Sequence, residues 1–207
     1  EGQLRRGGDG TWEHQWRFRC RDFDAARLMP PGAAPGLVTR LALEGALSGQ
    51  GAESLTAQAA GEALARWPDR SLLAAANVSI DASLADLRAP APLDRLTVRV
   101  EIADGQAGSE REKFVTAVTG SARIAPGEPG SARLAGEAAG GQFAADVRLP
   151  AAEGRREYAG EVELRGIDLA RLPAEVAVPR RLRGTSVSGR FSLEGDGLDA
   201  LRVRGRG

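Results

Sequence analysis

Apolar and polar residues alternate with a period of two along most of this 207-residue chain. The clearest run is 96–102, where leucine, valine and isoleucine alternate with threonine, arginine and glutamate; 78–84, 143–149 and 158–164 repeat the pattern. Successive side chains of a β-strand point to opposite faces of its sheet, so each run is predicted to be a half-buried strand. Together with weaker runs, the pattern predicts about ten strands or more.

Turn-forming residues separate these runs. Clusters of glycine, proline and aspartate occupy 30–32, 103–105, 126–130, 140–141 and 194–197. Short connections between alternating strands are typical of an antiparallel meander. Only 59–67 and 170–172 read as short helical turns. We therefore predict an all-β fold, an elongated antiparallel sheet with few helical turns.

Composition excludes several classes of protein. The chain has 28 basic and 28 acidic residues, so no net charge attracts it to nucleic acid. Cys20 is the single cysteine, which rules out an internal disulfide. No apolar run approaches the ~20 residues that span a bilayer as a helix. The chain begins at Glu1 without methionine and ends in an arginine- and glycine-rich stretch, so we expect residues 1–207 to be one fragment of a longer protein.

Two stretches of the sequence resemble each other. Residues 21–30 (RDFDAARLMP) parallel 165–173 (RGIDLARLP), and each is followed by a connector and a strand that ends in Leu-Glu-Gly. The repeat-like units extend over about 17–60 and 160–207. A repeated β unit indicates a sheet that grows by addition of strands.

The motifs of the second unit resemble a known family. The residues are Gly166 to Pro173, Val187 to Gly197 and Leu198 to Arg204, and their pattern is similar to the repeats of the AsmA-like superfamily, TamB-type members in particular. The resemblance implies a curled sheet, or β-taco, with an apolar concave groove. It also implies a periplasmic segment of an inner-membrane-anchored parent that moves phospholipid toward the outer membrane and meets an outer-membrane barrel protein.

No constellation of residues predicts catalysis, a metal site or a cofactor. His14 lies between two tryptophans in a strand pattern, and Cys20 is in phase with the apolar side, so both are expected to be structural. Asp24 and its repeat equivalent Asp168 are expected to accept backbone N–H bonds in a turn. The chain lacks aromatic stacking positions for nucleic acid. We expect no enzymatic activity.

The apolar side of the strands is the candidate site. A sheet with one continuous apolar side must be covered, either by a second sheet in a β-sandwich or by a ligand. Frequent alanine at inward positions favours an open groove for phospholipid acyl chains, and a structural or adhesive β-sandwich module is the alternative. The candidate groove residues are Leu41, Leu43, Val78, Ile80, Leu84, Leu96, Val98, Val100, Ile102, Phe143, Val147, Leu149, Val162, Leu164, Phe191 and Leu193.

Overall fold

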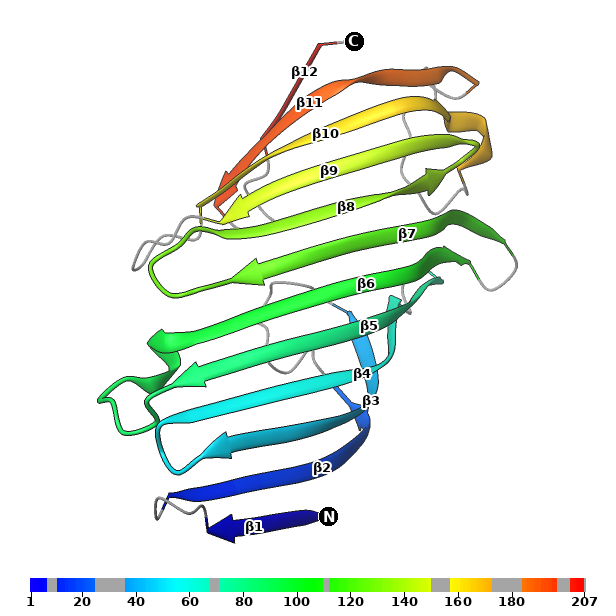
Figure 1. Ribbon diagram of the computed structural model, residues 1–207. Helices are drawn as coiled ribbons and strands as arrows, with labels where there is room; N and C mark the ends of the chain where they lie inside the picture. The colour runs from blue at the N-terminus through cyan, green and yellow to red at the C-terminus, as the bar shows by residue number, and fades with distance from the viewer. Residues whose placement is uncertain are drawn as a thin grey trace.

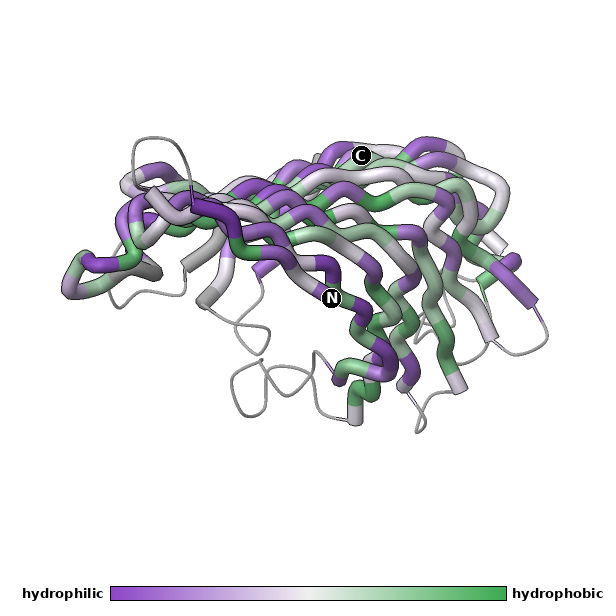
Figure 2. Tube along the Cα trace, turned by 60° about the horizontal axis from the view of Figure 1, so that its bottom comes forward, coloured by the Kyte–Doolittle hydropathy of each residue, from purple (hydrophilic) through white to green (hydrophobic). Residues whose placement is uncertain are grey.

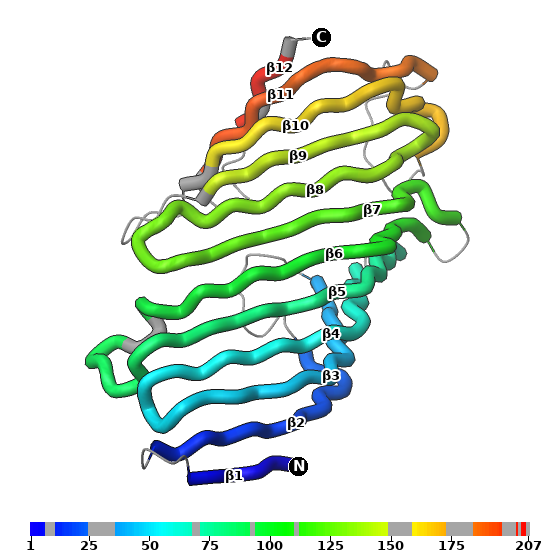
Figure 3. The backbone as a smooth tube through the Cα atoms, viewed as in Figure 1, coloured from blue at the N-terminus to red at the C-terminus, as the bar shows by residue number. Residues whose placement is uncertain are grey.

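The described strands form one antiparallel sheet. The computed structural model describes residues 1–6, 11–24, 36–67, 71–109, 112–149, 157–172, 184–196 and 202–206. Across these ranges, twelve strands follow one another in space in the order in which they occur in the chain (Figures 1 and 3). The first and last strands do not pair, so the sheet is open. The predicted all-β meander is confirmed.

The strands are long and nearly equal over the middle of the sheet. Their bounds are β1 Gly2–Arg6, β2 Trp12–Phe23, β3 Val38–Gln50, β4 Ser54–Trp67, β5 Leu72–Ala85, β6 Leu96–Ser109, β7 Lys113–Ile124, β8 Gly130–Ala138, β9 Gly141–Leu149, β10 Glu157–Asp168, β11 Ser186–Asp196 and β12 Arg202–Arg206. Two 3₁₀ turns, η3 Pro92–Arg95 and η4 Leu169–Arg171, complete the described elements.

The β-sandwich alternative is wrong for the described part of the chain. A sandwich needs a second sheet whose inner face fills a dry core. Instead, a single layer is observed, and its only buried hydrophobic residues among those described are Ala139 and Ile167, each 5% exposed. The large apolar side chains of the strands are therefore half-buried or exposed, which leaves one face of the sheet without a protein partner there.

The prediction of a helix at 59–67 is also wrong, because β4 runs through it. Alanine favours helices, but β4 pairs residue for residue with β3 and β5 along its length. Its small residues face larger ones on the adjacent strands: Ala59 lies opposite Ile80, and Gly61 lies opposite Leu43. Tertiary pairing outweighs the local propensity here. The turn predicted at 170–172 is present, shifted by one residue, as η4.

A line of β-bulges bends the sheet. The strand register shifts between Cys20 and Phe23 in β2, and comparable shifts occur in β6, β7 and β10. Positive φ values mark them at Asp22, Asp104, Ala117 and Gly166. A bulge bends its strand and increases the local twist. All four lie toward the same end of the strands, the right-hand end in Figure 1, and Figure 2 shows the resulting arch.

The two repeat-like units share one of these bulges. Four residues of β2, from Cys20 to Phe23, lie against three of β3, and β10 repeats this from Leu164 to Ile167 against β11. Asp168 then caps η4 by accepting the backbone N–H of Ala170 at 2.9 Å, as predicted. Asp24, its equivalent, accepts the hydroxyl of Thr39 at 2.9 Å, and its predicted bond to the following turn stays a prediction. The stretches 25–30 and 173–183, which follow the two aspartates, lie outside the described residues.

Replacement of Gly166 tests the role of the bulge. A Cβ on Gly166 would meet no atom within 4 Å, so the only cost of alanine is its φ of +62°. A left-handed alanine costs roughly 1–2 kcal/mol, and asparagine tolerates this region better. We expect Gly166→Ala to lower the unfolding free energy in urea by about 1 kcal/mol and Gly166→Asn by clearly less. Equal losses in the two variants would contradict a backbone cause.

Candidate functional site

The strand register aligns the apolar residues into two unbroken rows on one face. The first row crosses β2 to β12 through Phe18, Gly45, Ala59, Ile80, Val100, Ala122, Ala132, Val147, Gly160, Leu193 and Val203. The second crosses the same strands through Cys20, Leu43, Gly61, Val78, Ile102, Gly120, Leu134, Ala145, Val162, Phe191 and Gly205. We call this surface the apolar face.

The apolar face is long enough for an extended ligand. Neither row contains a charged or hydrogen-bonding side chain other than the thiol of Cys20. Strands in a sheet lie about 4.8 Å apart, so ten spacings from β2 to β12 extend over about 48 Å. An uninterrupted apolar path of that length exceeds what a monomeric soluble domain usually leaves uncovered.

All sixteen predicted groove residues occupy strand positions of this face. Nine of them belong to the two rows: Leu43, Val78, Ile80, Val100, Ile102, Val147, Val162, Phe191 and Leu193. Six others flank the rows by pairing with one another or with further apolar residues: Leu41, Leu84, Leu96, Val98, Phe143 and Leu164. Leu149 of β9 pairs with Gly130 of β8, and the side chain of Leu149 lies outside the described residues.

The aromatic end of this face was not predicted from the sequence. Trp12 and Trp16 in β2 are 50% and 48% exposed, and Phe18 and Phe23 of the same strand are exposed as well. Trp12 and Trp16 are in phase with His14 in the period-two pattern, and that pattern could have predicted their place on this face. Leu134 was also missed, because its strand is interrupted by alanine and glycine and gives a weak pattern. The β2 end therefore presents large flat side chains where the middle presents alanine and valine.

The exposure of the alanine residues shows how enclosed each face of the sheet is. On the apolar face Ala57, Ala59 and Ala63 are half-buried, whereas Ala60 and Ala144 on the opposite face are exposed. Identical side chains differ only through their surroundings. At these positions the apolar face is thus the more enclosed one.

Aromatic side chains on the apolar face cover glycines of the next strand. A Cβ added to Gly45 would lie 2.8 Å from Cζ of Phe18, and one on Gly136 would lie 3.0 Å from Cε1 of Phe143. Phe191 covers Gly205 in the same way. These rings lie over the backbone of the adjacent strand, so the face has few tall obstacles along its rows.

The opposite face is polar and largely self-paired. The strand positions between the two rows point their side chains to this opposite face. There Arg19 lies opposite Glu44 and Arg133 lies opposite Asp146, and both form ion pairs. A broad depression of about 890 Å³ lies on this face between β5 and β11. Its arginines are paired within it, Arg133 with Asp146 at 2.9 Å and Arg99 with Glu101 at 2.7 Å. Exposed pairs contribute little stability, and they leave little net charge to attract a ligand.

The residues considered for chemistry have structural surroundings. His14 lies opposite Gly49, with its imidazole over that glycine, and Cys20 is a half-buried member of the second row. In the described ranges, no three histidine, cysteine or acidic residues are grouped closely enough to hold a metal ion. The described elements also include no helix that could cross a membrane.

Comparison with family models, curated proteins and solved structures found no match to this chain. The register, burial and charge of its own residues therefore carry the functional argument.

Stability measurements can distinguish an open face from a dry core. Phe191 is half-buried, so we expect Phe191→Ala to lower the unfolding free energy by about 1 kcal/mol, well below the 3–5 kcal/mol of a buried phenylalanine. Ile167 is 5% exposed, and Ile167→Ala should cost about 2–4 kcal/mol. Urea denaturation of both variants checks this. A loss at Phe191 that exceeds the loss at Ile167 would show that the apolar face is covered in solution.

Proposed function

We propose that this chain is a segment of a cell-envelope protein that conducts phospholipids between the inner and outer membranes along its apolar face, in support of outer-membrane biogenesis. The observation that carries the proposal is the pair of unbroken apolar rows across β2 to β12, on the more enclosed face of an open sheet. A continuous apolar path of this kind suits acyl chains, which need apolar contact and no directional partner.

The uniformity of the rows supports passive sliding. From β3 to β10 each row offers similar aliphatic or small residues at every strand, so an acyl chain exchanges one set of contacts for an equivalent set as it moves. No deep pocket for a single tail is required, and no single residue is essential. The phosphate headgroup can remain in water along the open side of the curl.

The resemblance to AsmA-like proteins extends this proposal to location and partners. A periplasmic position, an inner-membrane anchor elsewhere in the parent and contact with an outer-membrane barrel protein all follow from that resemblance. We propose no cofactor, no nucleic-acid partner and no enzymatic reaction. A structural or adhesive role, in which another protein covers the apolar face, is the competing function.

Lipid extraction from natively purified protein tests the proposal. We expect phospholipid in the organic extract of the wild-type protein, detected by mass spectrometry. Val100→Asp places a carboxylate between Ile80 and Ala122 in the first row and should reduce bound phospholipid at least fivefold, because a charge among acyl chains is poorly solvated. Thr119→Asp is the matched control, since Thr119 is exposed on the polar face of the next strand.

A second variant and a second readout guard against unfolding of Val100→Asp. Leu134 is 37% exposed, so Leu134→Asp can hydrate its carboxylate without loss of the sheet. All three tryptophans, Trp12, Trp16 and Trp67, occupy positions of the apolar face. Phospholipid brominated on its acyl chains should therefore quench their fluorescence. Folded Leu134→Asp protein that binds as much lipid as the wild type, or wild-type protein without lipid or quenching, would favour the structural role.

A further inference from the structure

A second hollow lies on the polar face, in a region where apolar side chains interrupt the polar ones. It is an open cavity of about 580 Å³ near the ends of β3 to β7, beyond the line of bulges. This volume falls in the range of small-molecule sites. The side chains of Val38, Arg40, Leu64, Arg66, Leu73 and Ala75 in its lining belong to the face opposite the two apolar rows, as the register of β3, β4 and β5 shows. It is therefore separate from the site of the proposed function.

The floor of this cavity is apolar although its face is polar elsewhere. Val38 and Leu64 are 45% and 47% exposed, and Leu73 and Ala75 continue the floor onto β5. Leu64 pairs with Ala75, and Leu73 pairs with Arg66 two positions along the strands. Exposed aliphatic side chains at positions that the alternation reserves for polar residues are costly, which is typical of a surface that binds a ligand.

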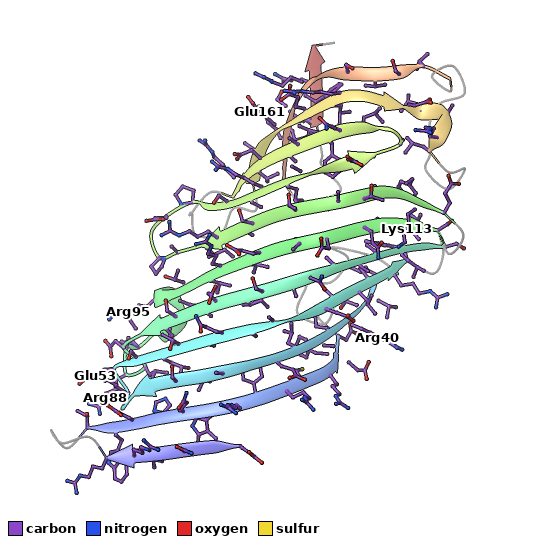
Figure 4. The ribbon with its side chains drawn as sticks, turned by 45° about the vertical axis from the view of Figure 1, so that its right-hand side comes forward. Arg40, Glu53, Arg88, Arg95, Lys113 and Glu161 are labelled. Carbon is purple, nitrogen blue, oxygen red and sulfur yellow. The ribbon has the colours of Figure 1, made fainter. Side chains whose placement is uncertain are left out.

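Cations surround this floor. Arg66 and Leu73 lie side by side in the register, Arg40 lies directly opposite Leu64, and Lys113 pairs with Gly108 at the far side. Figure 4 shows Arg40 and Lys113 at the same end of the strands. Within the described ranges, neither Arg40 nor Lys113 has an ion-pair or hydrogen-bond partner, and no carboxylate lines the cavity. In the depression between β5 and β11, by contrast, Arg99 and Arg133 form ion pairs with acidic residues of the same lining.

We infer that this cavity binds the anionic headgroup and first alkyl carbons of a single amphiphile. Arg40 and Lys113, with no carboxylate among the described residues of the lining, provide the charge complementarity, and the leucine and valine floor provides the apolar contact. A free anion would not use the floor, and a neutral amphiphile would not use the cations. The lining contains no aromatic side chain on which a nucleobase could stack.

Dodecyl phosphate, at concentrations where it is monomeric, is the probe. Titration into ¹⁵N-labelled protein should shift the backbone amides of 64–66, 73–75 and 106–108. Inorganic phosphate carries the same head without a chain, and dodecyl maltoside carries the same chain without a charge. We expect each of these two to bind at least tenfold more weakly at this site, because each lacks one of the two contacts.

Charge reversal identifies the groups responsible. The double variant Arg40→Glu, Lys113→Glu should weaken dodecyl phosphate binding at these amides at least tenfold. The double variant Arg17→Glu, Arg148→Glu changes the net charge equally on exposed arginines of the same face, outside the cavity, and should weaken it less than threefold. The amide spectrum of each variant also shows whether it is folded.

Three other outcomes would overturn this inference. Equal shifts with inorganic phosphate would indicate a simple anion site, and equal binding of dodecyl maltoside would remove the role of the cations. Shifts confined to amides of the apolar rows, such as those of 78–80 and 100–102, would assign binding to the other face alone. Conversely, shifts at 64–66 with none at the apolar rows would contradict the proposed lipid path and leave this site intact.

Discussion

The backbone hydrogen-bond ladder between neighbouring strands is the interaction on which this structure depends. In a sandwich or barrel, a dry core would fix the strands, but the described residues of this sheet bury almost no large side chain. The ladder is instead continuous, and β4 pairs with β3 and β5 without a shift over its whole length. A slip of one residue would move every apolar side chain to the polar face. Alternation thus specifies register, and register assembles both rows of the apolar face.

The strands and the apolar face could be predicted from the sequence because they depend on local alternation. Val98 and Val100 had to share a side of β6 in any sheet. Their positions beside Ile80 and Ala122 could not be predicted, since cross-strand alignment depends on loops and bulges that composition does not determine. The helix expected at 59–67 failed for the same reason: its alanines fill the space between two strands of larger residues, a constraint visible only after β3 and β5 are placed.

Curvature, rather than hydrophobicity, separates an open taco from a sandwich here. Bulged positions such as Asp104 and Gly166 bend the strands along one line and leave their pairing intact on either side. Glycines beneath Phe18, Phe143 and Phe191 keep the apolar face low. A sheet that is bent on one line and lined with small residues curves around a space without enough large side chains to fill it. Alanine abundance indicated this only weakly, because alanine is common on both faces.

Departures from alternation carry more information in a single-layer sheet than in a layered domain. In a sandwich, an apolar run such as Leu72 to Ala76 is explained by burial on both sides. In this sheet no described element covers the outer face over β5, so Leu73 and Leu64 have no core to join. Leu64 is 47% exposed, and its contact with water is unfavourable without any gain from burial on folding. The cations Arg40 and Lys113 beside them form no ion pair with another described residue. Two unsatisfied requirements, apolar contact and negative charge, meet in one cavity, and an anionic amphiphile satisfies both at once.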